Sequence, residues 1–82
     1  MTNHELKCDP EPFQALYDGR KNFEVRKCDD RTFSAGDTLF LREFNQINGQ
    51  YTGRHLTKQV TYMVRGPHWG LPENVVVMSV AS

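Results

Sequence analysis

A cluster of charged residues of mixed sign follows a glycine early in the chain. Its pattern is Gly-x-Lys-x-x-Glu-x-Arg, formed by Gly19, Lys21, Glu24 and Arg26. Lysine and arginine bind phosphate or carbonyl oxygens, while a carboxylate accepts a hydrogen bond from a base edge or moves a proton. The pattern therefore predicts a site for an anion or a polar ring. The alternative is a solvated strand end, whose ion pairs stabilise a fold by at most about 1 kcal/mol.

The geometry of this cluster depends on the strand that carries it. Residues two apart share one face of a strand, so Glu24 and Arg26 point one way while Phe23 and Val25 point the other. We expect the apolar pair to be the buried one. Lys21 lies on the apolar side of a regular strand, so it joins the site only if the preceding turn re-aims it.

The remaining sequence predicts a small scaffold rich in strands. A first strand at 4–8 leads into a helix that begins at Asp9 and ends at Gly19. The dipeptide Asn48-Gly49 predicts a hairpin, and Gly53 predicts a bulge after it. Further strands are expected at 22–26, 38–44, near 51, at 55–65 and at 75–80. Five or six strands with one short N-terminal helix indicate an α+β, mostly β domain that closes into a small β-barrel.

Size and charge narrow the class of protein. The 82 residues predict a single domain, 1–82, and the ten basic and ten acidic residues balance. A neutral chain does not suit binding to duplex DNA by bulk phosphate neutralisation. The sequence shows no signal peptide and no apolar run of about 18 residues, so we expect a cytoplasmic protein without membrane contact. In that compartment Cys8 and Cys28 are expected to be free thiols, and we expect a monomer.

No spacing in the chain indicates a metal or a cofactor. The potential ligands lie apart from one another, at His4, Cys8, Cys28, His55 and His68. Neither a phosphate-binding glycine loop nor a Gly-x-Ser-x-Gly motif is present. We therefore expect neither a metal site nor a cofactor.

Aromatic residues supply candidates for stacking on a ligand. Trp69 lies in a glycine-flanked loop beside His68, where it either fills the core or stacks on a nucleobase. Such a stack stabilises binding by roughly 1–3 kcal/mol. Tyr17 on the predicted helix is a second stacking candidate, and Lys7 on the first strand is a further cationic one.

With its elements in this order, the chain resembles the ASCH family, a branch of the PUA-like fold. The resemblance centres on Gly19-x-Lys21-x-x-Glu24-x-Arg26 and runs from the His-Glu-Leu-Lys strand to the Val-Val-Val-Met ending. It implies a PUA-like barrel with a cleft beside the helix, where RNA or a modified nucleoside binds. The residues expected to contact that ligand are Lys7, Tyr17, Lys21, Glu24, Arg26 and Trp69.

Two alternatives stay open. One ASCH-like group deacetylates acetylcytidine with a lysine, a threonine and a glutamate. Lys21 matches that lysine, Glu24 replaces the threonine and its hydroxyl, and Glu73 is a loose counterpart of the glutamate. The first alternative is thus a hydrolase acting on a modified nucleoside or RNA, with Glu24 as general base and Lys21 stabilising the oxyanion. The second is a phage-type accessory protein that acts through protein contacts, which predicts an exposed apolar patch.

Overall fold

A computed structural model describes all 82 residues. The elements in chain order are β1 (Asn3–Cys8), α1 (Pro10–Asp18), β2 (Phe23–Lys27), β3 (Thr38–Asn45), β4 (Gln50–Arg65) and β5 (Val75–Ala81). This confirms the predicted small, mostly β domain with five strands and one short N-terminal helix. The helix has nine residues, so it is too short to cross a membrane.

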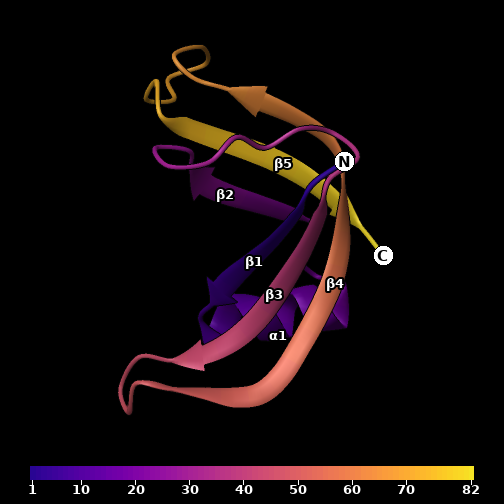
Figure 1. Cartoon of the computed structure of the whole chain (residues 1–82), viewed down its shortest axis with the longest axis vertical. Coiled ribbons are helices and arrows are strands. Elements are labelled where there is room, and N and C mark those ends of the chain that lie inside the picture. Colours follow the sequence, from indigo (N-terminus) through magenta and orange to yellow (C-terminus); the bar gives the residue numbers. More distant parts are fainter.

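The five strands form one sheet in the order β1-β3-β4-β5-β2. The β1–β3 pair is parallel, and the other pairs are antiparallel. The long β4 spans the molecule and bends, so that the sheet curls around α1 (Figure 1). The two edge strands, β1 and β2, do not pair with each other. The sheet is therefore a half-barrel with an open seam, and a closed PUA-like barrel stays a prediction.

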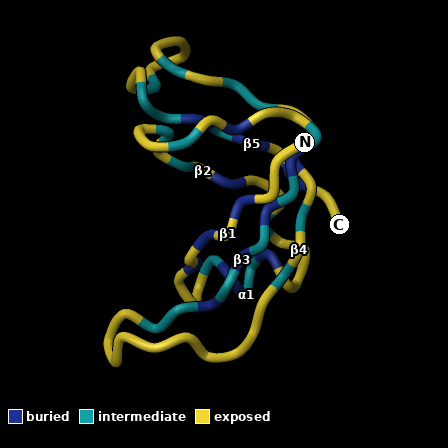
Figure 2. The backbone as a smooth tube through the Cα atoms, viewed as in Figure 1, coloured by how far each residue is buried: buried dark blue, intermediate teal, exposed yellow.

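The core fills the concave side of the sheet, where the buried backbone segments meet (Figure 2). The helix contributes Phe13 and Leu16, which pack with Leu39 and Leu41 of β3. The helix ends as predicted at Gly19, whose φ of 81° is left-handed and whose N–H bonds the Leu16 carbonyl. This packing fixes α1 directly beside the end of β1.

A hairpin turn and two register shifts shape β4. The predicted hairpin forms, but its turn spans residues 46–49, and of Asn48 and Gly49 only the glycine has a positive φ, of 69°. The bulge at Gly53, whose φ is 94°, forms as predicted. A second register shift, between Val60 and Tyr62, was not expected. The alternation of inward and outward side chains reverses at this shift. Tyr62 therefore points outward, although it lies two residues after the buried Val60.

The expected burial of β2 is inverted. The prediction that Phe23 and Val25 are buried is wrong, since they are 45% and 52% exposed, whereas Glu24 is only 2% exposed. The register explains this, because Glu24 lies across from Met78, which points into the core. On the outer face two rows cross β2, β5 and β4, namely Phe23–Ser79–Tyr62 and Val25–Val77–Val64.

Several expectations about single side chains are also settled. Trp69 is 75% exposed with a φ of 55° in the β4–β5 loop, so it does not fill the core. The Asp9 carboxylate does not cap the helix and instead accepts a hydrogen bond from Gln46 Nε2 at 2.8 Å. Cys8 and Cys28 are free thiols, as expected.

Candidate functional site

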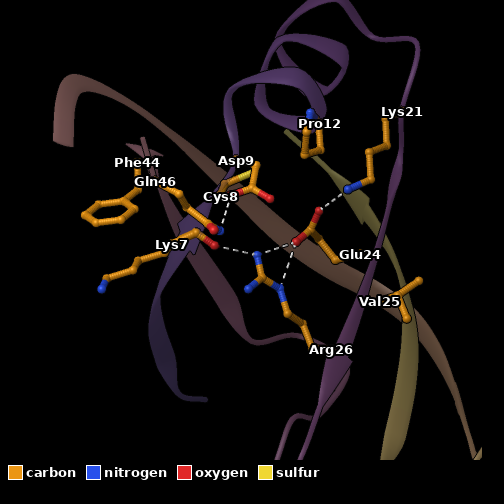
Figure 3. A pocket seen from close by; sticks show the side chains of 10 residues that line it. All are labelled: Lys7, Cys8, Asp9, Pro12, Lys21, Glu24, Val25, Arg26, Phe44 and Gln46. Atoms are coloured by element: carbon orange, nitrogen blue, oxygen red, sulfur yellow. Dashed lines mark hydrogen bonds and ion pairs between the residues drawn. The ribbon is translucent and has the colours of Figure 1, made fainter. Parts of the chain in front are cut away.

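The largest cleft lies at the open seam between β1 and β2, where α1 begins. Its volume is about 670 Å³, within the range of small-molecule sites. Its ten lining residues are Lys7, Cys8, Asp9, Pro12, Lys21, Glu24, Val25, Arg26, Phe44 and Gln46 (Figure 3). Three cationic and two anionic side chains leave the cleft with one net positive charge.

Glu24 lies between two cations in this cleft. Its Oε2 accepts a hydrogen bond from Lys21 Nζ at 2.6 Å. Its Oε1 accepts from Arg26 Nε at 3.0 Å and from Arg26 Nη2 at 2.8 Å. Burying a carboxylate is costly unless charged donors satisfy it, and both oxygens are satisfied here. The expectation of a solvated strand end is therefore wrong, and the acid acts as an anchor for two partly exposed cations.

Lys21 reaches the cleft because the turn after α1 leaves the regular strand path. The backbone N–H of Lys21 bonds the carbonyl of Ala15 at 3.0 Å, which ties the turn to the helix. This residue precedes β2, so strand parity does not apply to its side chain. The turn directs the Lys21 ammonium onto Glu24 (Figure 3). Lys21 therefore joins the site through the preceding turn, which was the condition for its joining.

Arg26 connects the two edges of the half-barrel. Its Nη2 donates to the backbone carbonyl of Lys7 at 3.0 Å, where no strand pairing exists. The third guanidinium nitrogen, Nη1, donates no hydrogen bond within the protein, and Lys21 Nζ donates only one. Donors of both cations therefore stay available to oxygens of a ligand.

The walls of the cleft are partly apolar. Phe44 lies under the Lys7 ammonium, with Nζ 4.4 Å from the ring centroid. Cys8 is buried at the end of β1, and its burial, followed by the charge of Glu24, raises the thiol pKa to about 11. A thiol this weakly acidic is protonated at neutral pH.

The structure brings four of the six predicted ligand-contacting residues into this cleft: Lys7, Lys21, Glu24 and Arg26. Tyr17 instead lines a separate hollow beside the β4 bulge, and Trp69 lies in the β4–β5 loop. Residues that the sequence did not assign to the site are Cys8, Asp9, Pro12, Val25, Phe44 and Gln46. No motif marks these residues, because the fold gathers them from β1, α1, β2 and the β3–β4 hairpin.

No group of three or more histidine, cysteine or acidic side chains lies close enough together to hold a metal ion. The cleft offers ammonium and guanidinium donors, a buried carboxylate and one aromatic wall. Such a set binds oxygens of an anionic or polar ligand by charge-assisted hydrogen bonds.

Fold and site together define a small half-barrel domain with a cationic cleft at its open seam. Residues 3–80 match the model of a family described as "Domain of unknown function (DUF3850)", and the chain belongs to that family. Over 66 residues it is 35% identical to the "Uncharacterized 12.9 kDa protein in GpA 3'region" of Escherichia phage P2. The match covers 80% of this chain and 58% of the phage protein, so the chain spans less than two thirds of that relative.

Proposed function

We propose that this domain binds RNA or a modified nucleoside in the cleft at the β1–β2 seam. The observation that carries the proposal is the placement of Lys21 and Arg26, which the buried Glu24 holds on one cleft. Because each cation keeps unused N–H donors, phosphate or carbonyl oxygens of a nucleotide are suitable partners. The resemblance of the Lys21-x-x-Glu24-x-Arg26 strand to the ASCH family supports the same ligand class.

The roles of the cleft residues follow from their contacts. Lys21 and Arg26 bind ligand oxygens, and Lys7 adds a third positive charge beside Phe44. Glu24 orients both neighbouring cations rather than meeting the ligand first, since its two oxygens are already occupied. The cleft volume of about 670 Å³ suits a group of nucleoside size.

The test is a titration of short single-stranded RNA and of free nucleosides and nucleotides, followed by NMR shifts and calorimetry. Lys21→Ala removes a charge-assisted hydrogen bond worth about 1.5–3 kcal/mol, so binding is expected to weaken about tenfold to a hundredfold. Lys27→Ala is the matched control, because it removes the same charge from the end of the adjoining strand β2, outside the cleft. Absence of wild-type binding, or equal weakening in both variants, would overturn the proposal.

A second variant separates the loss of positive charge from a loss of folding. Lys21→Ala leaves Glu24 with one cation, so circular dichroism must show that the fold persists. Lys21→Arg keeps the positive charge and is expected to retain part of the affinity. If this variant binds no better than Lys21→Ala while folded, positive charge at this position does not drive binding.

The hydrolase alternative has one observation in its favour, the 2.6 Å contact between Lys21 and Glu24 inside a cleft. In this reading a substrate displaces one cation from Glu24, which takes a proton from the attacking water while Lys21 stabilises the oxyanion. The acyl C–N bond of acetylcytidine or a P–O bond of RNA then breaks, and Glu24 returns the proton to the leaving nitrogen or oxygen. Incubation with acetylcytidine and with RNA, followed by chromatography, tests it. Turnover that disappears in Glu24→Gln would favour the hydrolase, and unchanged substrate would favour the binding protein.

The accessory-protein alternative predicted an exposed apolar patch, and the outer rows that include Phe23, Tyr62 and Val77 match that expectation. Nothing in the structure shows what covers this face. An interaction through it therefore stays a prediction, as do the monomeric state and the cytoplasmic location.

A further inference from the structure

A second hollow, which is more strongly basic, adjoins the seam cleft. This hollow has a volume of about 490 Å³ and shares Lys7 and Arg26 with the cleft. Its lining residues are Glu5, Leu6, Lys7, Arg26, Arg31, Arg42 and Tyr51. Four cations thus face a single acid, although the whole chain carries no net charge.

The cations of this hollow come from four separate segments. Arg31, in the loop after β2, donates to the Glu5 carbonyl of the edge strand at 3.4 Å. Arg42 of β3 pairs with the Glu5 carboxylate at 2.9 Å and stacks on Tyr51, with the guanidinium carbon 3.7 Å from the ring centroid. Lys7 extends from β1 on the side of the cleft away from Lys21 (Figure 3).

Positive charges gathered this way repel one another and favour an extended anion. A single nucleoside or nucleotide in the seam cleft reaches Lys21 and Arg26 but leaves Arg31 and Arg42 without a partner on the ligand. A chain of phosphates running past Arg26 meets each cation in turn. The exposed face of the Arg42–Tyr51 stack offers a flat surface on which a base can lie.

We infer that the cleft and the second hollow form one continuous path for single-stranded RNA, with one nucleotide at Lys21–Arg26 and its neighbours on Arg31 and Arg42. The inference rests on the proposed function and names its ligand as a strand rather than a free nucleoside. A neutral protein with this local track suits one strand better than a duplex, whose binding needs a wider basic surface.

The experiment compares mononucleotides with di-, tetra- and octanucleotides of RNA by calorimetry at several salt concentrations. For the wild type, affinity is expected to rise about tenfold or more from mononucleotide to tetranucleotide. The double variant Arg31→Gln/Arg42→Gln is expected to lose most of that rise. Its slope of log affinity against log salt is expected to flatten by about 0.7 for each phosphate that the variant no longer neutralises.

Arg20→Gln is the matched control, since Arg20 is exposed, pairs with Asp18 and lines neither hollow. The single variants Arg31→Gln and Arg42→Gln replace the double variant if it fails to fold. Flat length dependence, or Arg31 and Arg42 variants that behave like Arg20→Gln, overturns the inference while Lys21-dependent mononucleotide binding keeps the proposed function.

Additional ligands in the same experiment identify which class of anion binds. If neither mononucleotides nor strands bind, the proposed function fails and the inference falls with it. Equal competition by polyglutamate overturns the assignment to nucleic acid, because it shows a general polyanion track. DNA of the same sequence separates phosphate recognition from contacts to the ribose hydroxyl, and a stronger response to DNA than to RNA overturns the assignment to RNA.

Discussion

Glu24 shows how one buried carboxylate positions two cations in a cleft. Removing it from water costs several kcal/mol, and three charge-assisted hydrogen bonds from Lys21 and Arg26 offset that cost. In return the acid restricts two flexible cations, so less side-chain entropy remains to be lost when a ligand binds. Glu24 therefore contributes to the stability of the fold and also holds the two cations of the cleft in place.

Replacing Glu24 with glutamine is expected to destabilise the domain. The amide leaves two partly buried cations without a counter-charge, so the free energy of unfolding should fall by about 2–4 kcal/mol. Urea denaturation measures the change. Glu5→Gln is the control, since that pair with Arg42 is exposed and is worth less than about 1 kcal/mol. Equal losses in both variants would contradict the anchoring role of Glu24.

The two cysteines should differ in reactivity. Burial and the Glu24 charge raise the Cys8 pKa to about 11, so only about one thousandth of this thiol is ionised at pH 8. Cys28 is half-buried, and its Sγ lies 3.2 Å from Arg65 Nη2. Iodoacetamide followed by mass spectrometry should modify Cys28 first, and both thiols equally in urea. Equal rates in the folded protein would contradict this prediction.

At the scale of elements, the apolar pattern along a strand predicted the buried face in some strands and not in others. The alternation in β1 agrees with its buried side, whereas β5 carries valines on both faces and its run of apolar residues predicts burial without saying which face is inward. In β2 one face is apolar and the other is charged, yet the face that carries Glu24 is the inward one, so local alternation predicts the wrong side. The bulge after Val60 shifts the parity of β4, and no glycine or proline at that point announces it.

Asp37 joins the beginnings of β1 and β3. Burial alone raises its carboxyl pKa, but hydrogen bonds from His4, Thr2 and Ser34 outweigh burial and hold the pKa below its ordinary 3.8. The ionised form therefore stabilises the fold above pH 3.8, and this stability is lost as pH falls through the lowered value.

We expect Asp37→Asn to lower the free energy of unfolding by about 1.5–3 kcal/mol at neutral pH. The gap to the wild type should narrow as pH falls below 3.8. Thermal unfolding between acid and neutral pH measures it. The exposed Asp30 forms no hydrogen bond, so Asp30→Asn is the control and should cost little at any pH. A gap for Asp37→Asn that stays constant with pH would contradict the assignment.

At the scale of the molecule, the open seam leaves the two edge strands less fully paired than the three central ones. β3, β4 and β5 are each paired on both sides, whereas β1 and β2 are paired on one side only. Guanidinium groups bridge the gap, Arg26 to the Lys7 carbonyl and Arg31 to the Glu5 carbonyl. The cleft, which is the proposed binding surface, thus lies where the sheet is least continuous.

Hydrogen exchange should reflect this division. Amides of β2 are expected to exchange through local openings, while Leu39, Leu41 and Val60 in the central strands exchange only on global unfolding. Amide exchange followed by NMR over several denaturant concentrations measures both classes. RNA bound along the seam should slow exchange in β2 selectively. Uniform protection in the free protein would contradict the division.

The sequence by itself determined the element types, their order and the charged strand that lines the cleft. These features depend on neighbours along the chain: the glycine after the helix, the Asn48-Gly49 dipeptide, the alternation of β1 and the apolar run of β5. Only the tertiary structure decided that Glu24 is buried, that Phe23 faces outward and that Arg31 and Arg42 line a hollow beside the cleft. Such outcomes depend on which strands become neighbours and on the register between them, and these long-range pairings leave no local trace in the sequence.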